Sequence, residues 1–305
     1  MNAIELLHIR KTYNKGVIIA VDDVSFNVSE GEMFGLIGPD GAGKTSLFRI
    51  LTTLLLADSG TATVNGHDVV KDFKLIRHEV GYMPGRFSLY QDLSVKENLE
   101  FFATVFNTTI KENYDLIRDI YVQIEPFKDR RAGKLSGGMK QKLALCCALI
   151  HRPKVLFLDE PTTGVDAVSR KEFWEMLQRL KKEGITILVS TPYMDEATQC
   201  DRIALIQGGK IMSVNTPQNV ISQFPDPLFA VRASGMSHLL RELRQDPMIK
   251  SCFAFGDYHH VTFKPGGTQE ALKEELMSKS FPDVQVKAVQ PTIEDCFIQL
   301  MHHEQ

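Results

Sequence analysis

The sequence predicts an α/β fold: a mostly parallel sheet with an antiparallel β section and a helical insert, followed by a small C-terminal α+β domain. The first observation is a set of continuously apolar segments, MFGLIG, KVLFLDE and ITILVST, which are typical of strands buried on both faces. The second is the order in which strand, helix and strand alternate, as the crossovers of a parallel sheet require. The third is a glycine-rich loop, GPDGAGKTS, that follows the first apolar strand directly and opens a helix.

The N-terminal section is expected to form antiparallel strands. Short alternating segments such as VDDVSFNV lie between residues 4 and 34 and are interrupted at NKG (residues 14–16) and EG (residues 30–31). Alternation bounded by turn residues is typical of half-buried strands. An antiparallel β section therefore precedes the buried strand, the glycine-rich loop and the helix SLFRILTTLLL.

A helical insert is expected at about residues 87–152. Its first helix opens with Ser94 and Glu97 in a capping box, in which each side chain accepts a hydrogen bond from the other residue's backbone amide. After the insert, the amphipathic helix KEFWEMLQRLKKEG separates two apolar strands and closes on Gly184. These two strands are expected to lie parallel in the sheet.

A boundary between two domains is expected near the FPDP segment at residues 224–227, which follows the two-glycine hairpin RIALIQGGKI. The predicted domains are residues 1–224, which hold the α/β core, and residues 225–305, a small α+β domain. In the second domain, strand-like segments LFAVRA, HHVTFK and VQVKAV alternate with helical patterns at residues 237–244 and 269–277.

Composition is that of a soluble globular protein. Apolar residues make up 43% and charged residues 24% of the 305 residues, which argues against disorder. A formal net charge of -3 gives no basic surface of the kind that binds a phosphate backbone, so no nucleic acid is expected as a partner. The five cysteines show no paired spacing, which predicts buried apolar residues in a reducing compartment.

The N-terminal segment MNAIELLHIRKTY lacks the basic start and apolar stretch of a signal peptide. No apolar run approaches the roughly 20 residues that span a bilayer. A cytoplasmic location is therefore expected, and any membrane role must come from a partner.

The loop at residues 38–46 satisfies the phosphate-binding pattern of glycine, four residues, glycine, lysine and a hydroxyl. Its glycines let backbone amides point at phosphates, and the helix that begins at its end adds a positive dipole. Lys44 is expected to neutralise the β- and γ-phosphates of ATP, and Thr45 to offer a hydroxyl to Mg²⁺. A glycine-rich turn without a ligand is the alternative. The candidate nucleotide-binding residues of the loop are Gly38, Pro39, Asp40, Gly41, Ala42, Gly43, Lys44, Thr45 and Ser46.

Two acids end the buried strand VLFLDE. Asp159 is expected to hold Mg²⁺, directly or through water, and Glu160 to orient and polarise the attacking water as general base. Acids also follow strands simply because loops are solvated, so the pair alone is weak evidence. Together with the phosphate loop, the pair predicts a nucleoside triphosphatase.

A third segment, LSGGMKQK, predicts a helix with an anion-binding end. Ser136 is expected to cap a helix over residues 139–150, and Gly137 and Gly138 leave the amides at its N-terminus open. An ordinary capped helix after a loop is the alternative.

With these motifs the sequence resembles the ABC ATPase family, over nearly the whole chain. The motifs match in order: Tyr13 in the aromatic loop, residues 38–45 in Walker A, residues 135–141 in the signature, Asp159 and Glu160 in Walker B, and Asp166 in the D-loop. The signature residues expected to face a partner's ATP are Leu135, Ser136, Gly137, Gly138 and Gln141.

The resemblance implies a P-loop NTPase fold in a head-to-tail dimer with two ATP molecules and Mg²⁺ at its interface. Each nucleotide would lie between Walker A of one subunit and the signature of a second nucleotide-binding subunit. Tyr13 would stack on adenine, unless it only packs its own strand. Integral membrane permease subunits would be the other partners, on the inner face of the cell membrane. By analogy, the chain looks like a subunit of a drug- or polymer-exporting system, because it contains the segments GPDGAGKT, STPYMDEA and PTIEDCFIQLM.

Two positions depart from the family pattern. Family members usually carry glutamine at the position of Gly85, where its side chain meets Mg²⁺ and the attacking water. The usual switch-loop histidine is replaced by Pro192, which offers the γ-phosphate no donor. Gln91 and His78 lie nearby in the sequence, but their offsets do not match the motif. Loss of one positioned donor typically slows a reaction by about 10²- to 10³-fold, so hydrolysis at this Walker A is expected to be slow.

Three functions stay open. The first is an ATPase subunit that energises an exporter through nucleotide-driven dimer closure, as the degenerate half of a heteromeric pair. The second is an ATP-binding regulatory subunit with little turnover, and the third is a soluble ABC protein of translation or DNA repair. Proteins of the third kind usually carry two cassettes or long coiled-coil insertions, which this sequence lacks. The C-terminal domain is expected to dimerise or regulate, with passive stabilisation as the alternative.

Overall fold

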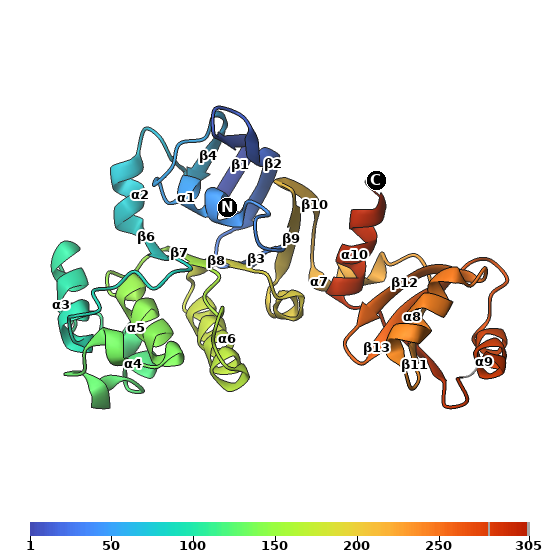
Figure 1. Ribbon diagram of the computed structural model, residues 1–305. Helices are drawn as coiled ribbons and strands as arrows, with labels where there is room; N and C mark the ends of the chain where they lie inside the picture. Colours follow the sequence, from blue (N-terminus) through green and yellow to red (C-terminus); the bar gives the residue numbers. More distant parts are fainter. Residues whose placement is uncertain (280, 304–305) are drawn as a thin grey trace. The chain divides into compact units, whose positions relative to one another are not determined.

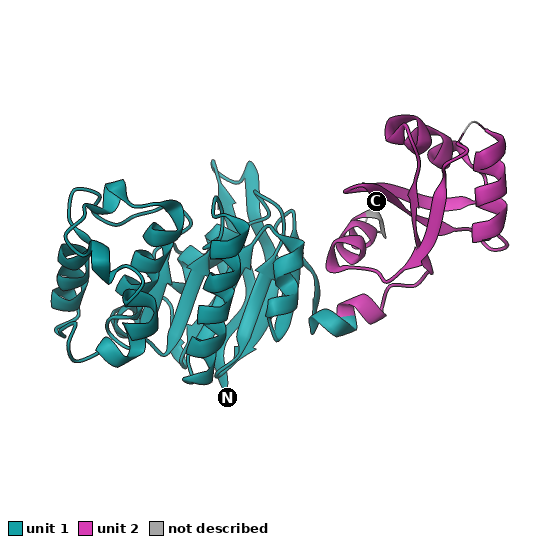
Figure 2. Ribbon diagram, turned by 90° about the horizontal axis from the view of Figure 1, so that it is seen from below, with its two compact units in different colours: residues 1–219, 303–305 teal, residues 220–302 magenta. Residues whose placement is uncertain are grey.

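The computed structural model describes residues 1–279 and 281–303, which divide into two compact units (Figure 1, Figure 2). The first unit comprises residues 1–219 together with residue 303, and the second comprises residues 220–302. The division therefore falls just before the FPDP segment that the sequence indicates as the boundary.

A six-stranded sheet forms the centre of the first unit. Its strands are β3 (Met33–Ile37), β6 (Val80–Met83), β7 (Val155–Asp159), β8 (Thr186–Thr191), β9 (Arg202–Gln207) and β10 (Lys210–Asn215). They lie in the order β10-β9-β3-β8-β7-β6, and all neighbours are parallel except β10 and β9. Every residue of β3, β7 and β8 is buried, as in strands covered on both faces. The prediction of a mostly parallel sheet is confirmed.

A second sheet supplies the antiparallel section. Its strands are β1 (Asn2–Tyr13), β2 (Ile18–Ser29), β4 (Ser59–Val64) and β5 (His67–Asp68), in the order β2-β1-β4-β5. β4 and β5 meet at Asn65 and Gly66, whose positive φ angles of 50° and 76° suit a tight hairpin turn. This sheet, the parallel sheet and helix α1 (Lys44–Leu51) share one apolar core.

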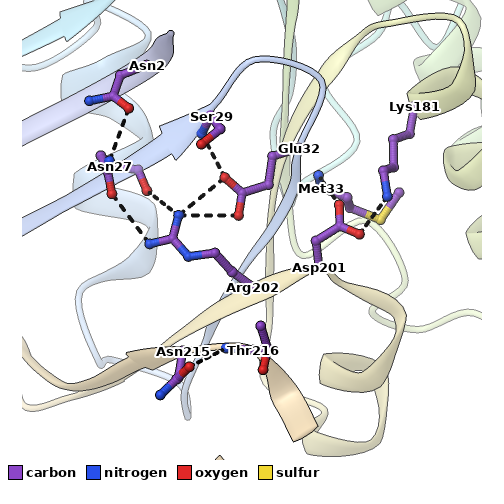
Figure 3. A network of polar contacts seen from close by, with 10 residues as sticks. All are labelled: Asn2, Asn27, Ser29, Glu32, Met33, Lys181, Asp201, Arg202, Asn215 and Thr216. Atoms are coloured by element: carbon purple, nitrogen blue, oxygen red, sulfur yellow. Dashed lines mark hydrogen bonds and ion pairs between the residues drawn. The ribbon is translucent and has the colours of Figure 1, made fainter. Parts of the chain in front are cut away.

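Polar contacts tie the two sheets together at the start of β9 (Figure 3). Arg202 lies between Glu32 and Asn27, with Nη1 3.4 Å from Glu32 Oε1 and 3.5 Å from the Asn27 carbonyl oxygen. Asp201 accepts a hydrogen bond from Lys181 Nζ at 2.6 Å. These contacts fix the amino ends of β3 and β9, so the phosphate loop emerges from the opposite, carboxyl end of a well-anchored strand.

Helices flank the parallel sheet and form the predicted insert. Outside the insert lie α2 (Phe73–Glu79), α6 (Ala167–Lys182) and the short η3 (Met194–Gln199), whereas α7 (Pro217–Ser222) spans the division between the two units. The insert contains α3 (Val95–Val105), α4 (Tyr114–Tyr121), α5 (Gly137–Leu149) and the short η1 (Glu125–Phe127) and η2 (Ala132–Lys134). Ser94 and Glu97 form the predicted capping box, with the Ser94 amide donating to Glu97 Oε2 at 2.7 Å. In Figure 1 α3, α4 and α5 cluster together beside β6 and β7.

The second unit is a small α+β domain, as predicted. Its elements are β11 (Leu228–Arg232), α8 (Met236–Gln245), β12 (Ile249–Phe255), β13 (Tyr258–Phe263), α9 (Gln269–Ser278), β14 (Gln285–Val289) and α10 (Ile293–His303). The antiparallel strands lie in the order β12-β13-β11-β14, which with the β-α-β-β-α-β succession is the arrangement of ferredoxin-like folds. α8 and α9 share an apolar core with the sheet. α10 is joined to β13 through His260 Nδ1, 2.7 Å from Asp295 Oδ1.

All five cysteines are buried, as the sequence predicts. Burial raises the pKa of Cys252 and Cys296 to about 11, so these thiols behave as small apolar groups. Across residues 1–279 and 281–303, no helix is both long enough and apolar enough to cross a membrane.

Candidate functional site

The phosphate loop runs from the end of β3 to the start of α1, and close packing requires glycine at two of its positions, Gly38 and Gly43. A Cβ at Gly43 would lie 2.2 Å from the carbonyl oxygen of Ala20, and Gly43 also has a φ of 104°. A Cβ at Gly38 would lie 2.2 Å from the carbonyl oxygen of Ile206. The glycine pattern therefore follows from backbone conformation and from the approach of neighbouring main chain.

Lys44 joins the phosphate loop to the end of β7. Its side chain is buried, and Nζ donates to the carbonyl oxygens of Gly38 at 2.8 Å and Pro39 at 2.9 Å. The same nitrogen lies 3.0 Å from Glu160 Oε1. The structure thus brings together the lysine and the proposed general base, which are more than a hundred residues apart in the sequence.

Ser190 of β8 anchors both acids of the β7 end. Asp159 is buried, and its Oδ1 accepts a hydrogen bond from Ser190 Oγ at 2.7 Å. The Glu160 amide donates to the Ser190 carbonyl at 3.1 Å and to Ser190 Oγ at 3.0 Å. Glu160 has a φ of 51°, a left-handed conformation that costs a non-glycine residue free energy.

Burial, with a smaller contribution from the Asp159 charge, raises the pKa of Tyr82 to about 12. Tyr82 lies on β6, next to β7 in the sheet. The phenol therefore stays neutral beside this carboxylate.

The donor set at this edge of the sheet fits Mg²⁺. Thr45, half-buried in the first turn of α1, and the buried Asp159 offer hydroxyl and carboxylate oxygens, the ligands that Mg²⁺ prefers. Within the described part of the chain, no group of three or more His, Cys, Asp or Glu side chains could hold a metal ion. Mg²⁺ at these two residues would therefore complete its coordination with water and phosphate oxygens.

Tyr13 lies beside the phosphate loop. It ends β1, and its hydroxyl is 3.1 Å from Ser46 Oγ in the first turn of α1. Lys11 Nζ lies 5.9 Å from the centre of the tyrosine ring. The ring is therefore next to the predicted nucleotide residues, and its stacking on adenine stays a prediction.

The signature segment begins a helix, as predicted. Ser136 is the N-cap of α5, and its Oγ accepts from the Met139 amide at 3.4 Å, although the helix starts at Gly137 and so earlier than expected. A Cβ at Gly138 would lie 3.0 Å from Ser169 Oγ, so glycine lets α5 approach α6 closely. Leu135 is buried and Gln141 is half-buried. Ser136 and Gly137 are exposed, which leaves the positive end of α5 accessible.

Asp166 is the N-cap of α6. Its Oδ1 accepts from the amides of Val168 at 3.1 Å and Ser169 at 3.0 Å. These hydrogen bonds, that of Ser169 first, hold the pKa of Asp166 below its usual range. Ser169 thus bonds to the D-loop aspartate and lies close to Gly138 of the signature. Among the described residues, no hydrogen bond or ion pair links the signature to the phosphate loop of the same chain.

Gly85 lies directly against the two acids. A Cβ on it would be 3.0 Å from the Asp159 carbonyl oxygen and 3.8 Å from Glu160 Cβ. The position is therefore at the site, as the motif alignment expects, but contributes no side chain.

The two neighbouring polar residues, Gln91 and His78, make contacts elsewhere. The Gln91 carbonyl accepts from the Gly133 amide at 2.9 Å, within the insert. The His78 ring lies edge-on to Phe106, 6.2 Å away. Pro192 is half-buried between Thr191 and Tyr193 at the end of β8.

Ser190 was not singled out in the sequence. The sequence nevertheless indicates that Ser190 lies near the acids, because the carboxyl ends of neighbouring parallel strands meet at one edge of a sheet. ITILVST ends with two hydroxyl residues, and the β7–β8 register pairs Asp159 with Ser190.

Comparison with known proteins places the chain in a family. A family model described as ABC transporter matches residues 21–163. "Probable multidrug ABC transporter ATP-binding protein YbhF" of Escherichia coli (strain K12) is 38% identical over 287 residues, which cover 92% of this chain and 49% of that protein. The chain thus spans about half the length of this relative. Nod factor export ATP-binding protein I of Rhizobium sp. (strain N33) is 37% identical over 224 residues, 72% of this chain and 73% of that protein.

Solved structures agree with this placement. An ATP binding subunit of an ABC transporter has a TM-score of 0.66 and 26% identity, covering 73% of this chain and 93% of that chain. The fold is also that of cbiO1 from Clostridium perfringens, with a TM-score of 0.65 and 24% identity over 81% of this chain and 96% of that chain. The extensive match to the Nod factor export protein, together with the ordered motifs, shows that the chain belongs to the family of ABC transporter ATP-binding proteins.

Proposed function

We propose that the chain binds and hydrolyses ATP as a nucleotide-binding subunit of an ABC exporter. The observation that carries this proposal is the pairing of Lys44 Nζ with Glu160 Oε1 at 3.0 Å. A phosphate-binding lysine and a general base held this close can act on the same γ-phosphate and its attacking water.

Each residue of the site has a distinct task. Lys44 neutralises charge on the β- and γ-phosphates, and the loop amides hold the same phosphates. Glu160 orients and polarises the water, and Ser190 keeps its backbone in place. Thr45 and Asp159 would hold Mg²⁺, which when bound neutralises charge that develops on the transferring phosphoryl group.

Dimer closure is part of the proposal because, among the residues that the structure describes, the phosphate loop and the signature of one chain are not joined to each other. The exposed N-terminus of α5, with Ser136 and Gly137, is available to a nucleotide held by another chain. We propose that two nucleotide-binding chains close head to tail around ATP, and that closure drives the membrane partner. Permease subunits would hold the chain on the cytoplasmic face of the membrane, since one relative is named as a multidrug ABC transporter ATP-binding protein.

The export direction and the heteromeric assembly are further parts of this proposal. Relatives named for multidrug transport, Nod factor export and doxorubicin resistance support export. Gly85 lies against Asp159 without a side chain, and Pro192 replaces the usual histidine, so this chain's own site would turn over slowly. A partner chain with an intact site could still use the signature of α5.

The same two positions favour one second candidate, an ATP-binding regulatory subunit with little turnover of its own. Multiple-turnover phosphate release from the reconstituted pair, with each subunit's general base changed to glutamine in turn, separates the two functions. Turnover that is unchanged by Glu160→Gln and is lost when the partner's glutamate is changed supports the regulatory subunit. A loss when Glu160 is changed supports hydrolysis at this chain's site, and a chain that binds no MgATP contradicts both functions.

A further inference from the structure

We propose that Glu196 is a positioning residue for the nucleotide site, acting through Thr162 and Thr191 without touching ATP. The inference rests on the proposed function, because it gives a role to residues that surround the Lys44–Glu160 pair. Glu196 lies in η3, and only 4% of its surface is exposed. A buried carboxylate is retained where its hydrogen bonds and charges are matched by specific partners.

One oxygen of Glu196 joins two loops of the site. Glu196 Oε2 accepts from Thr162 Oγ1 at 3.0 Å and from Thr191 Oγ1 at 2.5 Å. Thr162 follows Glu160 by two residues, and Thr191 directly precedes Pro192. Both threonines are buried, so water does not compete for their hydroxyls. The carboxylate therefore sets the distance between the loop after the general base and the switch loop.

The path of the switch loop depends on the same hydroxyl. Thr191 Oγ1 also accepts from the Tyr193 amide at 3.0 Å, so the residues on both sides of Pro192 are fixed through it. Proline has no amide hydrogen, which removes one possible anchor from the centre of this segment. The hydrogen bond from Thr191 to Glu196 thus ties this turn to the core.

The other oxygen of Glu196 faces α6. Glu196 Oε1 accepts no hydrogen bond in the described part of the chain, and its nearest cation is Arg170, with Nη1 3.8 Å away. The Arg170 guanidinium also lies 4.9 Å from the centre of the Tyr193 ring. The Arg170 amide donates to the Asp166 carbonyl at 2.9 Å. A contiguous set of contacts therefore runs from the D-loop end of α6 through Arg170 and Glu196 to the switch loop.

The proposal is tested by three substitutions in the full chain. Glu196→Leu removes both threonine contacts. Glu196→Gln keeps an oxygen that can accept from both hydroxyls but loses the charge that faces Arg170. Asp195→Asn neutralises the exposed neighbouring carboxylate and is the matched control. Phosphate release gives kcat, and calorimetry with MgATP gives Kd.

We expect Glu196→Leu to lower kcat by about 10- to 100-fold with Kd unchanged, because small misplacements of catalytic groups cost rate more than binding. Glu196→Gln should recover most of the rate, and Asp195→Asn should match the wild type. A leucine variant that hydrolyses at the wild-type rate, or one that loses affinity and rate together, overturns the proposal.

Amide hydrogen exchange supplies a readout that does not depend on turnover. The amide of Tyr193 should exchange faster in Glu196→Leu than in the wild type, and at the wild-type rate in Glu196→Gln and Asp195→Asn. If Glu196→Leu does not fold, Glu196→Met removes the same two contacts and leaves the Thr191 hydroxyl, the acceptor for the Tyr193 amide, in place. A wild type without turnover contradicts the proposed function alone. Unchanged exchange at Tyr193 in the leucine or methionine variant contradicts the role of Glu196.

Discussion

Lys44 Nζ lies 3.0 Å from Glu160 Oε1, so the phosphate loop and the end of β7 are joined by one ion pair. The lysine is buried, whereas the glutamate side chain is 22% exposed. The positive charge is thus fixed within the loop, and the carboxylate keeps a face towards solvent from which it can reach a water molecule.

Lys44→Ala should weaken MgATP binding by about 10- to 100-fold, the range expected for loss of a charge-assisted hydrogen bond. Isothermal titration calorimetry measures the change. Lys154→Ala is the matched control, because that lysine is exposed and paired with Glu79 away from the loop. Equal affinity in wild type and Lys44→Ala would contradict the assignment of the phosphate loop.

Glu160→Gln should trap ATP and strengthen dimerisation. The substitution keeps the size of the side chain and leaves Lys44 and the loop in place, but it removes the base that activates water. Size-exclusion chromatography with light scattering, in the presence of MgATP and of the partner chain, measures the dimer, and retained labelled nucleotide measures trapping. Hydrolysis at the wild-type rate would remove Glu160 from the mechanism.

Asp295→Asn should destabilise the C-terminal unit at neutral pH by about 1 kcal/mol. Although burial opposes it, hydrogen bonds from His260 and Thr292 hold the pKa of Asp295 below its ordinary 3.8. Because folding lowers this pKa, the stabilisation is complete above 3.8 and is lost as the pH falls through the folded-state value.

Thermal unfolding of the wild type and of Asp295→Asn, followed from neutral pH to below 3.8, checks this dependence. The difference between the two proteins should be constant at neutral and mildly acidic pH and should shrink below that value. Asp257→Asn, an exposed position in the same unit, should show no such difference. A difference that grows on acidification would contradict the proposed contribution of the Asp295 carboxylate.

Ending the chain after residue 224 should leave MgATP binding unchanged and weaken assembly. The predicted nucleotide and signature residues all lie in the first unit. The truncation exposes Val220, which is buried and whose carbonyl accepts from Cys296 Sγ at 3.5 Å, so a second truncation after Asn219 is the control. Calorimetry and light scattering measure the two effects. Loss of ATP binding by a truncated chain with a folded core would show that the predicted division is wrong.

The spacing of residues within short motifs predicted the loops of the site. It did not predict the residues whose side chains fix the positions of these loops. The phosphate loop and the acid pair are short patterns whose chemistry is contained in a few consecutive residues. Glu196 acts on Thr162 from more than thirty residues away, and Ser190 acts on Asp159 across the β7–β8 pairing. Such contacts depend on strand register and on the position of η3, which a single sequence does not specify.

The fold likewise has some features that local patterns predict and others that they do not. The buried strands and the capping box at Ser94 are strong local patterns and were predicted from the sequence. β4 and β5 were not, although Asn65 and Gly66 between alternating residues are a hairpin signal. β12 and α10 were not predicted either, so the predicted small α+β domain lacked the ferredoxin-like strand order. That order depends on pairings between distant strands.

The last prediction concerns Gly85 and Pro192, two positions that serve the same γ-phosphate and water in the family pattern. The purified homodimer should bind ATP but hydrolyse it slowly. Addition of an intact partner chain should restore turnover through the partner's phosphate loop and this chain's Ser136, Gly137 and Gly138. Gly85→Gln combined with Pro192→His should raise the homodimer's rate by about 10²-fold if one positioned donor has its usual effect.

The packing at Gly85 makes the two single substitutions informative. A Cβ at Gly85 would meet the Asp159 carbonyl oxygen at 3.0 Å, so the chain beside Glu160 must move by a few tenths of an ångström to accept glutamine. Gly85→Gln alone should therefore gain little, and Pro192→His alone also little, because groups that act as a unit are not additive. Phosphate release from the wild type, both single variants and the double variant measures this coupling. An unmodified homodimer that already turns over at about 10 per second, the rate of a typical enzyme, would contradict the degenerate site and would require another residue to supply the missing contacts.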